Sequence, residues 1–224
     1  PFTFPKAPTL PKARFEHPPV VVGAGPAGLF AALTLARAGV QPILIERGKP
    51  VEERTKSVQM MQEQGILDPE SNVQFGEGGA GAFSDGKLTT GTKSPLIRTV
   101  LQTFVDHGAP EDILYIAKPH VGTDLLKGVV RSMRQKIIQL GGQVRFDTRL
   151  TGLMMRGESI EGITMLCGGE TQEIRTDTVI LAIGHSARDT MQTLFRQGVR
   201  MEQKPFAMGV RIEHPQALIS QSQY

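Results

Sequence analysis

The sequence predicts an α/β fold in which a Rossmann-like parallel sheet is joined to a three-stranded β-meander. Two observations carry this prediction. Residues 20–45 read as strand, helix and strand within thirty residues, which is the signature of a parallel crossover. Residues 150–155, 160–166 and 171–175 are three β-like runs separated by turn residues, which is typical of a meander.

The other elements follow from apolar spacing and from end signals. Helices are expected over 26–38, near 51–64, over 96–105, after a Thr123 cap to about 140, and from a Ser186 cap to Gly198. Short buried strands are expected at 20–22, 43–45, 144–146 and 178–183. Residues 206–212 resemble a strand that leaves for another sheet.

These elements divide the chain of 224 residues into three parts. Residues 1–17 carry four prolines and are expected to form an extended leader. Residues 18–204 form the main domain, with a helical and loop insertion at about 48–120. Residues 205–224 read as the start of a second domain that holds substrate, so we expect the chain to be a piece of a longer protein.

Composition excludes several classes of protein. The net charge is +3, there is no Trp and there are two Tyr, so no nucleic-acid surface is expected. The single cysteine, Cys167, excludes an internal disulfide and a redox pair. No membrane span, signal peptide, metal-ligand spacing or nucleophile motif is found, and a cytoplasmic location is expected.

The stretch from Gly23 to Gly28 carries G-x-G-x-x-G between the first strand and the first helix. Gly23 would let the strand turn sharply, and Gly28 would let the helix pack closely. Gly25 would let a diphosphate approach the backbone, where the helix N-terminus offers free N–H groups and a positive dipole end. This context predicts a dinucleotide site.

Glu46 stands at the carboxyl end of the second strand, where a carboxylate can accept hydrogen bonds from ribose hydroxyls. A ribose 2'-phosphate would be repelled there. The expected dinucleotide therefore carries an ordinary adenosine ribose.

Residues 76–81 match the same G-x-G-x-x-G pattern without a preceding strand or a following helix. They are therefore predicted to form a backbone loop and not a second dinucleotide fold. Its backbone donors are expected to be unencumbered, so the loop either contacts a ligand or is mobile.

The order of elements, with a long insertion, a meander and then "TVILAIG", resembles the FAD domain of the glutathione-reductase-type flavoprotein superfamily. The stretches "ERGKPVEERTKSV", "NVQFGEGGAGAFSDGKLTTG" and "KPHVGTDLL" resemble the uncharacterised bacterial FAD-dependent dehydrogenases within it. The superfamily's late Gly-Asp motif, which closes the flavin site, is not found before Tyr224.

The resemblance implies FAD as cofactor and assigns site residues. The diphosphate would be held by Gly23, Gly25, Pro26, Ala27 and Gly28. The adenosine would be contacted by Glu46, Arg47, Arg149 and Leu150, and backbone approach would occur at Ala182 and Gly184. The loop that carries Gly79, Ala80, Gly81 and Lys87 would pass near the isoalloxazine ring.

The predicted function is an FAD-dependent oxidoreductase, a dehydrogenase that transfers a hydride between an unidentified small organic substrate and flavin, with NAD(P)H as a candidate electron donor. The alternatives are a flavin-binding module with structural FAD and an FAD-dependent RNA-modifying enzyme. No catalytic residue or oligomeric state is assigned. Lys87, His120 and His185 are each weighed between a role at the site and an ordinary loop role, while His107 and His214 are interpreted as structural.

Overall fold

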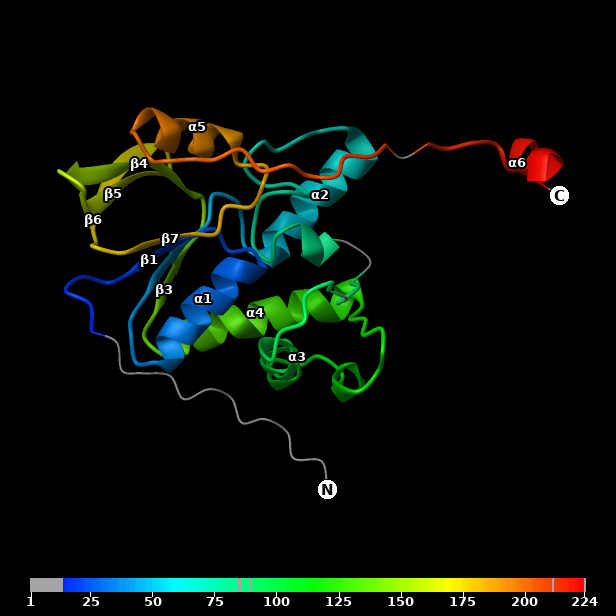
Figure 1. Ribbon diagram of the computed structural model, residues 1–224, viewed down its shortest axis with the longest axis horizontal. Helices are drawn as coiled ribbons and strands as arrows, with labels where there is room; N and C mark the ends of the chain where they lie inside the picture. The colour runs from blue at the N-terminus through cyan, green and yellow to red at the C-terminus, as the bar shows by residue number, and fades with distance from the viewer. Residues whose placement is uncertain (1–13, 84–85, 89, 211, 224) are drawn as a thin grey trace, which may run out of the picture.

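The computed structural model describes residues 14–83, 86–88, 90–210 and 212–223. Its main sheet has four parallel strands in the order β3-β2-β1-β7 (Figure 1). The strands are β1 (Val20–Val22), β2 (Ile43–Ile45), β3 (Gln143–Arg145) and β7 (Val179–Leu181). The α/β fold with a Rossmann-like parallel sheet is thereby confirmed.

The first crossover runs from β1 through α1 (Pro26–Arg37) to β2. Val20 pairs with Ile43 and Val22 with Ile45, so the two strands lie in parallel register. The helix has proline in its first turn, where no N–H is needed, and Gly39 follows it with a φ of +81°. Strand, turn and helix are therefore specified by local sequence.

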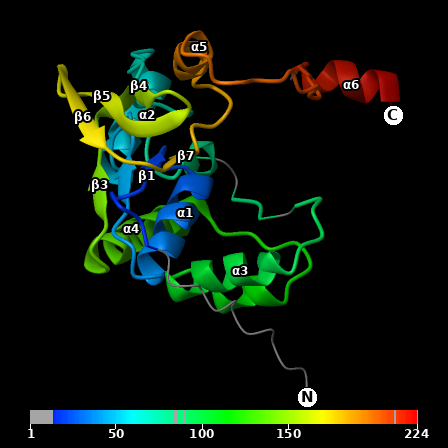
Figure 2. The same cartoon turned by 60° about the vertical axis from the view of Figure 1, so that its left-hand side comes forward.

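The parallel sheet is buried on both faces, as its β-branched strands require. Val21 and Leu44 point into a cluster with α1 and with α4 (Thr123–Gln139). Val20, Val22 and Ile45 point the other way, into a cluster with the meander. Figures 1 and 2 show α1 and α4 side by side on one face and the meander on the other.

The meander consists of β4 (Thr148–Arg156), β5 (Ser159–Cys167) and β6 (Glu170–Arg175), and all its neighbours pair antiparallel. Its turns use Gly157, Gly168 and Gly169, which all have positive φ. The helix α5 (Arg188–Arg196) packs on β4 through the buried Leu194. The predicted meander is confirmed.

The insertion holds α2 (Val51–Gln64), η1 (Ala80–Phe83), α3 (Leu96–Asp106) and η2 (Glu111–Leu114). Two expected caps are wrong. Thr123 is the first residue of α4 and Gly122 occupies the cap position, while Ala187 and not Ser186 precedes α5. Neither helix has a side-chain cap hydrogen bond, and the residues at the cap positions, Gly122 and Ala187, have no polar side chain to provide one.

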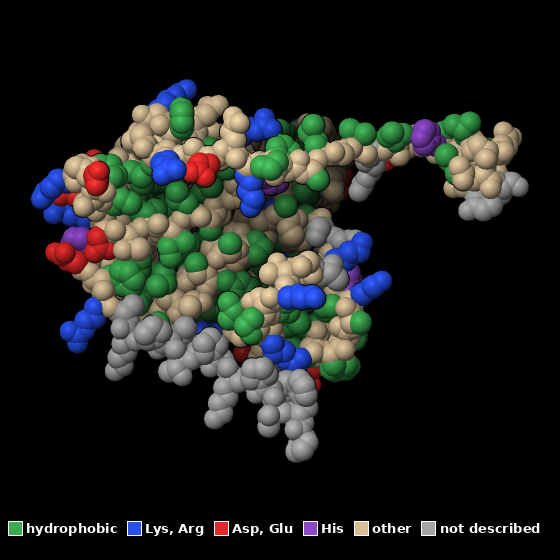
Figure 3. Space-filling view, in the orientation of Figure 1, with side chains coloured by type: hydrophobic (Ala, Val, Ile, Leu, Met, Phe, Trp, Pro, Cys, Tyr) green, Lys and Arg blue, Asp and Glu red, His purple; other side chains and the backbone are tan. Residues whose placement is uncertain are grey.

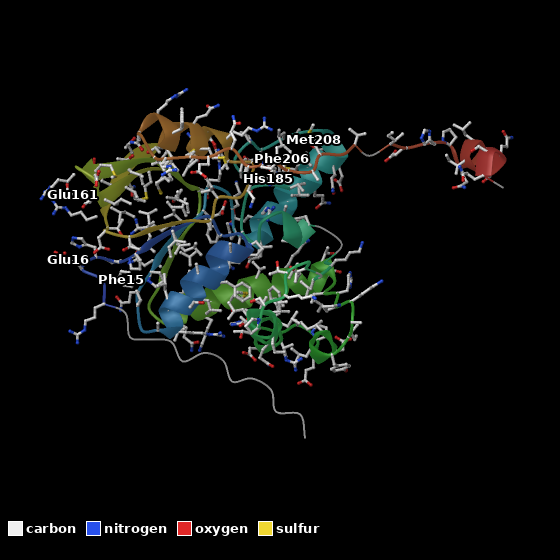
Figure 4. The ribbon with its side chains drawn as sticks, in the orientation of Figure 1. Phe15, Glu16, Glu161, His185, Phe206 and Met208 are labelled. Carbon is white, nitrogen blue, oxygen red and sulfur yellow. The ribbon has the colours of Figure 1, made fainter. Side chains whose placement is uncertain are left out.

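The strand expected over 206–212 is not observed in the described part of that segment. Phe206, Met208 and Val210 are more than four-fifths exposed, and the segment leads away from the body to α6 (Gln216–Gln223) (Figures 1 and 2). Figure 3 shows apolar side chains along this arm, and Figure 4 labels Phe206 and Met208 on it. A strand needs a partner for its ladder, and no described residue pairs with this segment. The expected leader lies mostly in residues 1–13, outside the described residues.

Candidate functional site

A cavity of about 380 Å³ lies at the carboxyl ends of β1, β2 and β7, the edge where ligands bind in open α/β sheets. Most of the predicted site residues line it. They are Gly23, Gly25, Pro26, Ala27, Glu46, Arg47, Gly79, Ala80, Arg149, Leu150, Ala182 and Gly184. The fold therefore brings predicted residues that are far apart in the chain together around one cavity.

Gly23 and Gly28 are glycines because of protein packing. Gly23 has a φ of +100°, and a Cβ built on it would lie 2.5 Å from the carbonyl oxygen of Ala182. A Cβ built on Gly28 would lie 1.7 Å from the carbonyl oxygen of Gly23. The sharp turn and the close helix packing expected at these positions are both present.

Gly25 differs from both neighbours. Its φ of −71° is open to any residue, and a Cβ built there would meet only the Cα of Gly79, at 3.8 Å. Packing therefore does not require glycine at this position, while the residue lines the cavity. A bare backbone facing a cavity fits a ligand that must approach closely.

The N-terminus of α1 opens onto the same cavity. The first backbone hydrogen bond of the helix runs from Leu29 N–H to Gly25 O, at 2.9 Å. Within the described residues no hydrogen bond uses the N–H of Ala27 or Gly28. Free first-turn donors at the positive end of a helix suit an anionic group, so the turn fits the diphosphate of a dinucleotide.

Glu46 is 5% exposed and binds three backbone N–H groups. Its Oε2 accepts from Ala24 at 2.7 Å, and its Oε1 accepts from Gly48 at 2.9 Å and from Gly76 at 3.0 Å. Glu46 therefore joins the first turn, the end of β2 and the glycine-rich loop. A carboxylate has about four acceptor positions, so the predicted ribose contact is compatible with this arrangement and stays a prediction.

Four charged side chains form a network beside Glu46. Arg47 binds Glu70 at 2.7 Å and Asp189 at 2.9 and 3.1 Å, and it stacks on the Phe75 ring at 4.2 Å. Arg149 reaches Glu70 at 3.0 Å and Asp189 at 3.4 Å. The network ties β2, the insertion, β4 and α5 together at the adenosine end predicted from the sequence.

Charge in this network favours the ionised form of Asp189. Partial burial opposes ionisation, but the hydrogen bond and positive charge of Arg47, with the charge of Arg149, outweigh it and lower the pKa of Asp189. Glu70 and Asp189 were missed in the sequence analysis because they lie 23 and 142 positions along the chain from their partner Arg47. No local pattern marks them.

Residues 76–79 of the second G-x-G-x-x-G stretch form a loop that packs on the first stretch, and its last two residues begin η1. The N–H of Gly78 donates to Ala24 O at 2.8 Å, and a Cβ built on Gly79 would lie 3.2 Å from the Cα of Gly25. The expectation of unencumbered donors is wrong for four residues. The N–H groups of Gly76, Glu77, Gly78 and Gly79 all have backbone or carboxylate acceptors, because the loop is held against the turn.

Glu77 in this loop is fully buried and was also missed. Its Oε2 accepts from Val51 N–H at 2.8 Å and lies 3.3 Å from Arg134, while Oε1 has no partner within the described residues. Burial raises the pKa of Glu77 to about 7, against the opposing hydrogen bond from Val51 and the charge of Arg134.

Three predicted residues do not line this cavity. Gly28 lies behind the turn, while Gly81 and Lys87 line a second cavity of about 200 Å³. That cavity is mostly apolar and lies between α1, α3, α4 and the loop. Its lining residues are Pro26, Leu29, Phe30, Gly78, Gly81, Gly86, Lys87, Leu88, Phe104, Leu126, Val130 and Met133. Pro26 borders both cavities.

The four histidines considered in the sequence analysis lie in different surroundings. His185 lines the first cavity, and His120 pairs with Lys87 in an isolated antiparallel bridge (Figure 4 labels His185). His107 is buried, its Nδ1 lies 3.0 Å from the Ser132 hydroxyl, and burial lowers its pKa. His214 is exposed.

No group of metal-ligating side chains is found in the described ranges. Likewise, none of the described helices is both long and apolar enough to cross a bilayer.

A family described as pyridine nucleotide-disulphide oxidoreductase matches residues 18–199. An uncharacterised protein of Clostridium beijerinckii is 53% identical over 92% of this chain and 38% of its own length. Digeranylgeranylglycerophospholipid reductase 1 of Methanococcoides burtonii is 24% identical over 74% of this chain and 37% of its own length. The chain thus spans less than two fifths of these relatives.

Among solved structures, THI4 of Thermovibrio ammonificans superposes with a TM-score of 0.53 at 16% identity. The match covers 82% of this chain and 64% of that one. This likeness supports the fold.

Proposed function

Because this chain belongs to the pyridine nucleotide-disulphide oxidoreductase family, we propose that it forms the FAD-binding part of a flavin-dependent dehydrogenase. The FAD prediction is confirmed at the level of the family. The observation that carries the proposed site is Gly25, whose missing side chain is unexplained by packing and faces the cavity beside a helix N-terminus. The whole protein would transfer a hydride between an organic substrate and flavin.

Each part of the cavity has a role in this proposal. The N–H group of Ala27 would bind the diphosphate, and the field of α1 would stabilise its charge. Glu46 would accept hydrogen bonds from the ribose, and Arg47 and Arg149 would border the adenosine. When bound, FAD supplies the hydride-accepting chemistry, which the protein side chains alone lack.

The family name includes disulphide chemistry, but this chain has one cysteine. Cys167 lies on β5, where the Thr148 hydroxyl approaches its sulfur at 3.4 Å. A dithiol relay needs two neighbouring cysteines. The proposed reaction is therefore reduction or oxidation of a carbon centre, with no disulfide contributed by this chain.

The second cavity favours a substrate with an apolar part. Its lining is almost entirely aliphatic, aromatic or glycine. Pro26 borders both cavities, and Gly79 and Ala80 of the cofactor cavity lie in the chain between Gly78 and Gly81 of the second cavity. The reductases of digeranylgeranylglycerophospholipid among the relatives act on molecules with long apolar chains. We therefore place an apolar portion of the substrate next to the loop.

The experiment starts with the full-length protein. Its bound cofactor is released and identified by mass, and the anaerobic protein is titrated with NADH, NADPH and a panel of apolar and polar substrates while flavin absorbance is followed. Bleaching by a nicotinamide and recovery with an apolar acceptor supports the proposal. Flavin that no reductant bleaches supports a module with structural FAD, and the lack of any flavin contradicts both.

A further inference from the structure

Arg54, the fourth residue of α2, is a fully buried charged side chain that does not line the cofactor cavity. Its guanidinium donates to five carbonyl oxygens, all in one segment of the chain. These are Asn72 at 2.8 Å, Val73 at 2.9 Å, Gly76 at 3.3 Å, Glu77 at 2.6 Å and Gly79 at 2.8 Å. The guanidinium also stacks on the Phe83 ring at 4.6 Å.

This burial is costly for a cation without a direct ion pair. Burial lowers the pKa of Arg54 to about 10, and the nearby charges of Glu46 and Glu77 oppose that fall. The side chain therefore stays charged at neutral pH. The five N–H donors of an arginine, spread over a planar group, can bind several carbonyl oxygens at once. A lysine has three donors on a single nitrogen and cannot reach the same set of oxygens.

The carbonyl contacts fix one side of the glycine-rich loop. Gly76, Gly78 and Gly79 have φ values of +113°, +84° and +61°, so this backbone is open to many conformations when unrestrained. A Cβ built on Gly76 would lie 2.4 Å from Cδ of Arg54, which shows how closely the loop wraps the side chain.

The opposite side of the loop meets the cofactor turn. Gly76 N–H donates to Glu46 and Gly78 N–H donates to Ala24 O, while Gly79 packs on Gly25. Gln74, Phe75, Gly76, Gly79 and Ala80 form one wall of the cofactor cavity. Arg54 thus holds the rear of a wall whose front faces the cofactor site.

We propose that Arg54 is a positioning residue for the cofactor. Its hydrogen bonds to the loop carbonyls hold this wall of the cavity in place before the cofactor binds. Cofactor binding then does not have to order the loop. The inference rests on the proposed cofactor site and adds a residue that touches no ligand. A residue that only supports the core would lower stability without changing the environment of the flavin.

The test uses full-length protein with Arg54→Lys and Arg54→Met, and with Arg131→Lys as matched control. Arg131 also contacts α2, through Glu52 at 3.2 Å, but it is exposed and makes no hydrogen bond to the loop. Dissociation constants for FAD come from fluorescence titration of the apoprotein, and the absorption and circular dichroism of the bound flavin are recorded. We expect Arg54→Lys to weaken FAD binding at least about tenfold and to alter the flavin spectrum, with no change in the control.

An Arg54→Lys protein that is less stable but binds FAD with wild-type affinity and spectrum overturns the inference. If both Arg54 variants fail to fold, hydrogen exchange on the wild-type protein decides. Equal protection of residues 72–79 with and without FAD supports positioning by Arg54, whereas protection that appears only with FAD contradicts it.

Gly25→Ala separates this inference from the proposed site. If Gly25→Ala retains FAD, the cofactor site itself is misplaced. If Gly25→Ala loses FAD while Arg54→Lys binds normally, only the role of Arg54 is wrong.

Discussion

Two stretches of this protein carry the same glycine pattern and are built differently. Residues 23–28 form the turn between β1 and α1, where a strand, a proline and a helix fix the backbone locally. Residues 76–81 form a loop and the start of η1, and the conformation of the loop depends on Glu46, Arg54 and the first turn. The first stretch specifies its own structure, and the second is shaped by side chains from elsewhere.

This difference explains why the first pattern predicts a diphosphate-binding turn and the second does not. In the first stretch, Gly23 and Gly28 must be glycine because a Cβ would clash with backbone atoms. A Cβ on Gly25 would clash with nothing. In the second, Gly76 makes room for Arg54, and Gly79 makes room for Gly25 and Pro26. A glycine pattern therefore predicts a diphosphate-binding turn only where the sequence also predicts a strand before it and a helix after it.

The largest expected effect is at Gly28. In Gly28→Ala the new Cβ would overlap the Gly23 carbonyl oxygen, with only 1.7 Å between them, so we expect a loss of about 3 kcal/mol in the free energy of unfolding. Gly81→Ala is the comparison in the second stretch, because a Cβ built there meets nothing within 4 Å. Chemical denaturation measures both, and equal losses would contradict the packing account.

A pH effect is expected at Glu77. Its pKa rises to about 7 on folding from a usual value near 4.5, so the folded state binds more protons than the unfolded state between these values. Stability from this group is present at low pH and is lost as pH rises toward 7. Relative to Glu77→Gln, the wild type should lose on the order of 2 kcal/mol between pH 5 and pH 8.

Unfolding of both proteins at several pH values measures this difference. If the free energies of unfolding of wild type and Glu77→Gln changed with pH in parallel, Glu77 would be ionised in the folded protein across the whole range, and the prediction would be wrong.

A smaller effect is expected at Asp189. Asp189→Asn removes the two-oxygen contact with Arg47, but the carboxylate is 46% exposed, so the loss of stability should be at most about 1 kcal/mol. Salt should reduce the difference because the pair is accessible to ions. Denaturation at low and high ionic strength tests this, and a larger loss that ignores salt would contradict a surface pair.

The first crossover, the meander and the placement of Glu46 could be predicted because their signals are local. Val20–Val22 and Ile43–Ile45 are short buried strands, and glycine and proline mark the ends of α1. Parallel strands that share an edge then bring Gly25 and Glu46 together. These inferences needed no knowledge of distant contacts.

The parts of the site that could not be predicted depend on contacts between residues far apart in the chain, which leave no local pattern in the sequence. Asp189 meets Arg47 only after β7 returns to the sheet, and Arg54 is an ordinary polar position of α2 until the loop folds over it. The structure places Lys87 in the lining of the second cavity, and its predicted position beside the cofactor ring stays a prediction. The strand expected over 206–212 is absent from the described part of that segment, because a strand-like sequence does not itself supply a partner strand.

Gly25→Ala tests the central claim most directly, with Gly91→Ala as control, since a Cβ on Gly91 meets nothing within 4 Å. The measurement is the dissociation constant for FAD on the apoprotein, alongside the free energy of unfolding. We predict unfolding within about 1 kcal/mol of wild type and FAD affinity at least about a hundredfold weaker, because the methyl group occupies the path of the diphosphate. Unchanged FAD affinity in a well-folded Gly25→Ala protein would contradict the account.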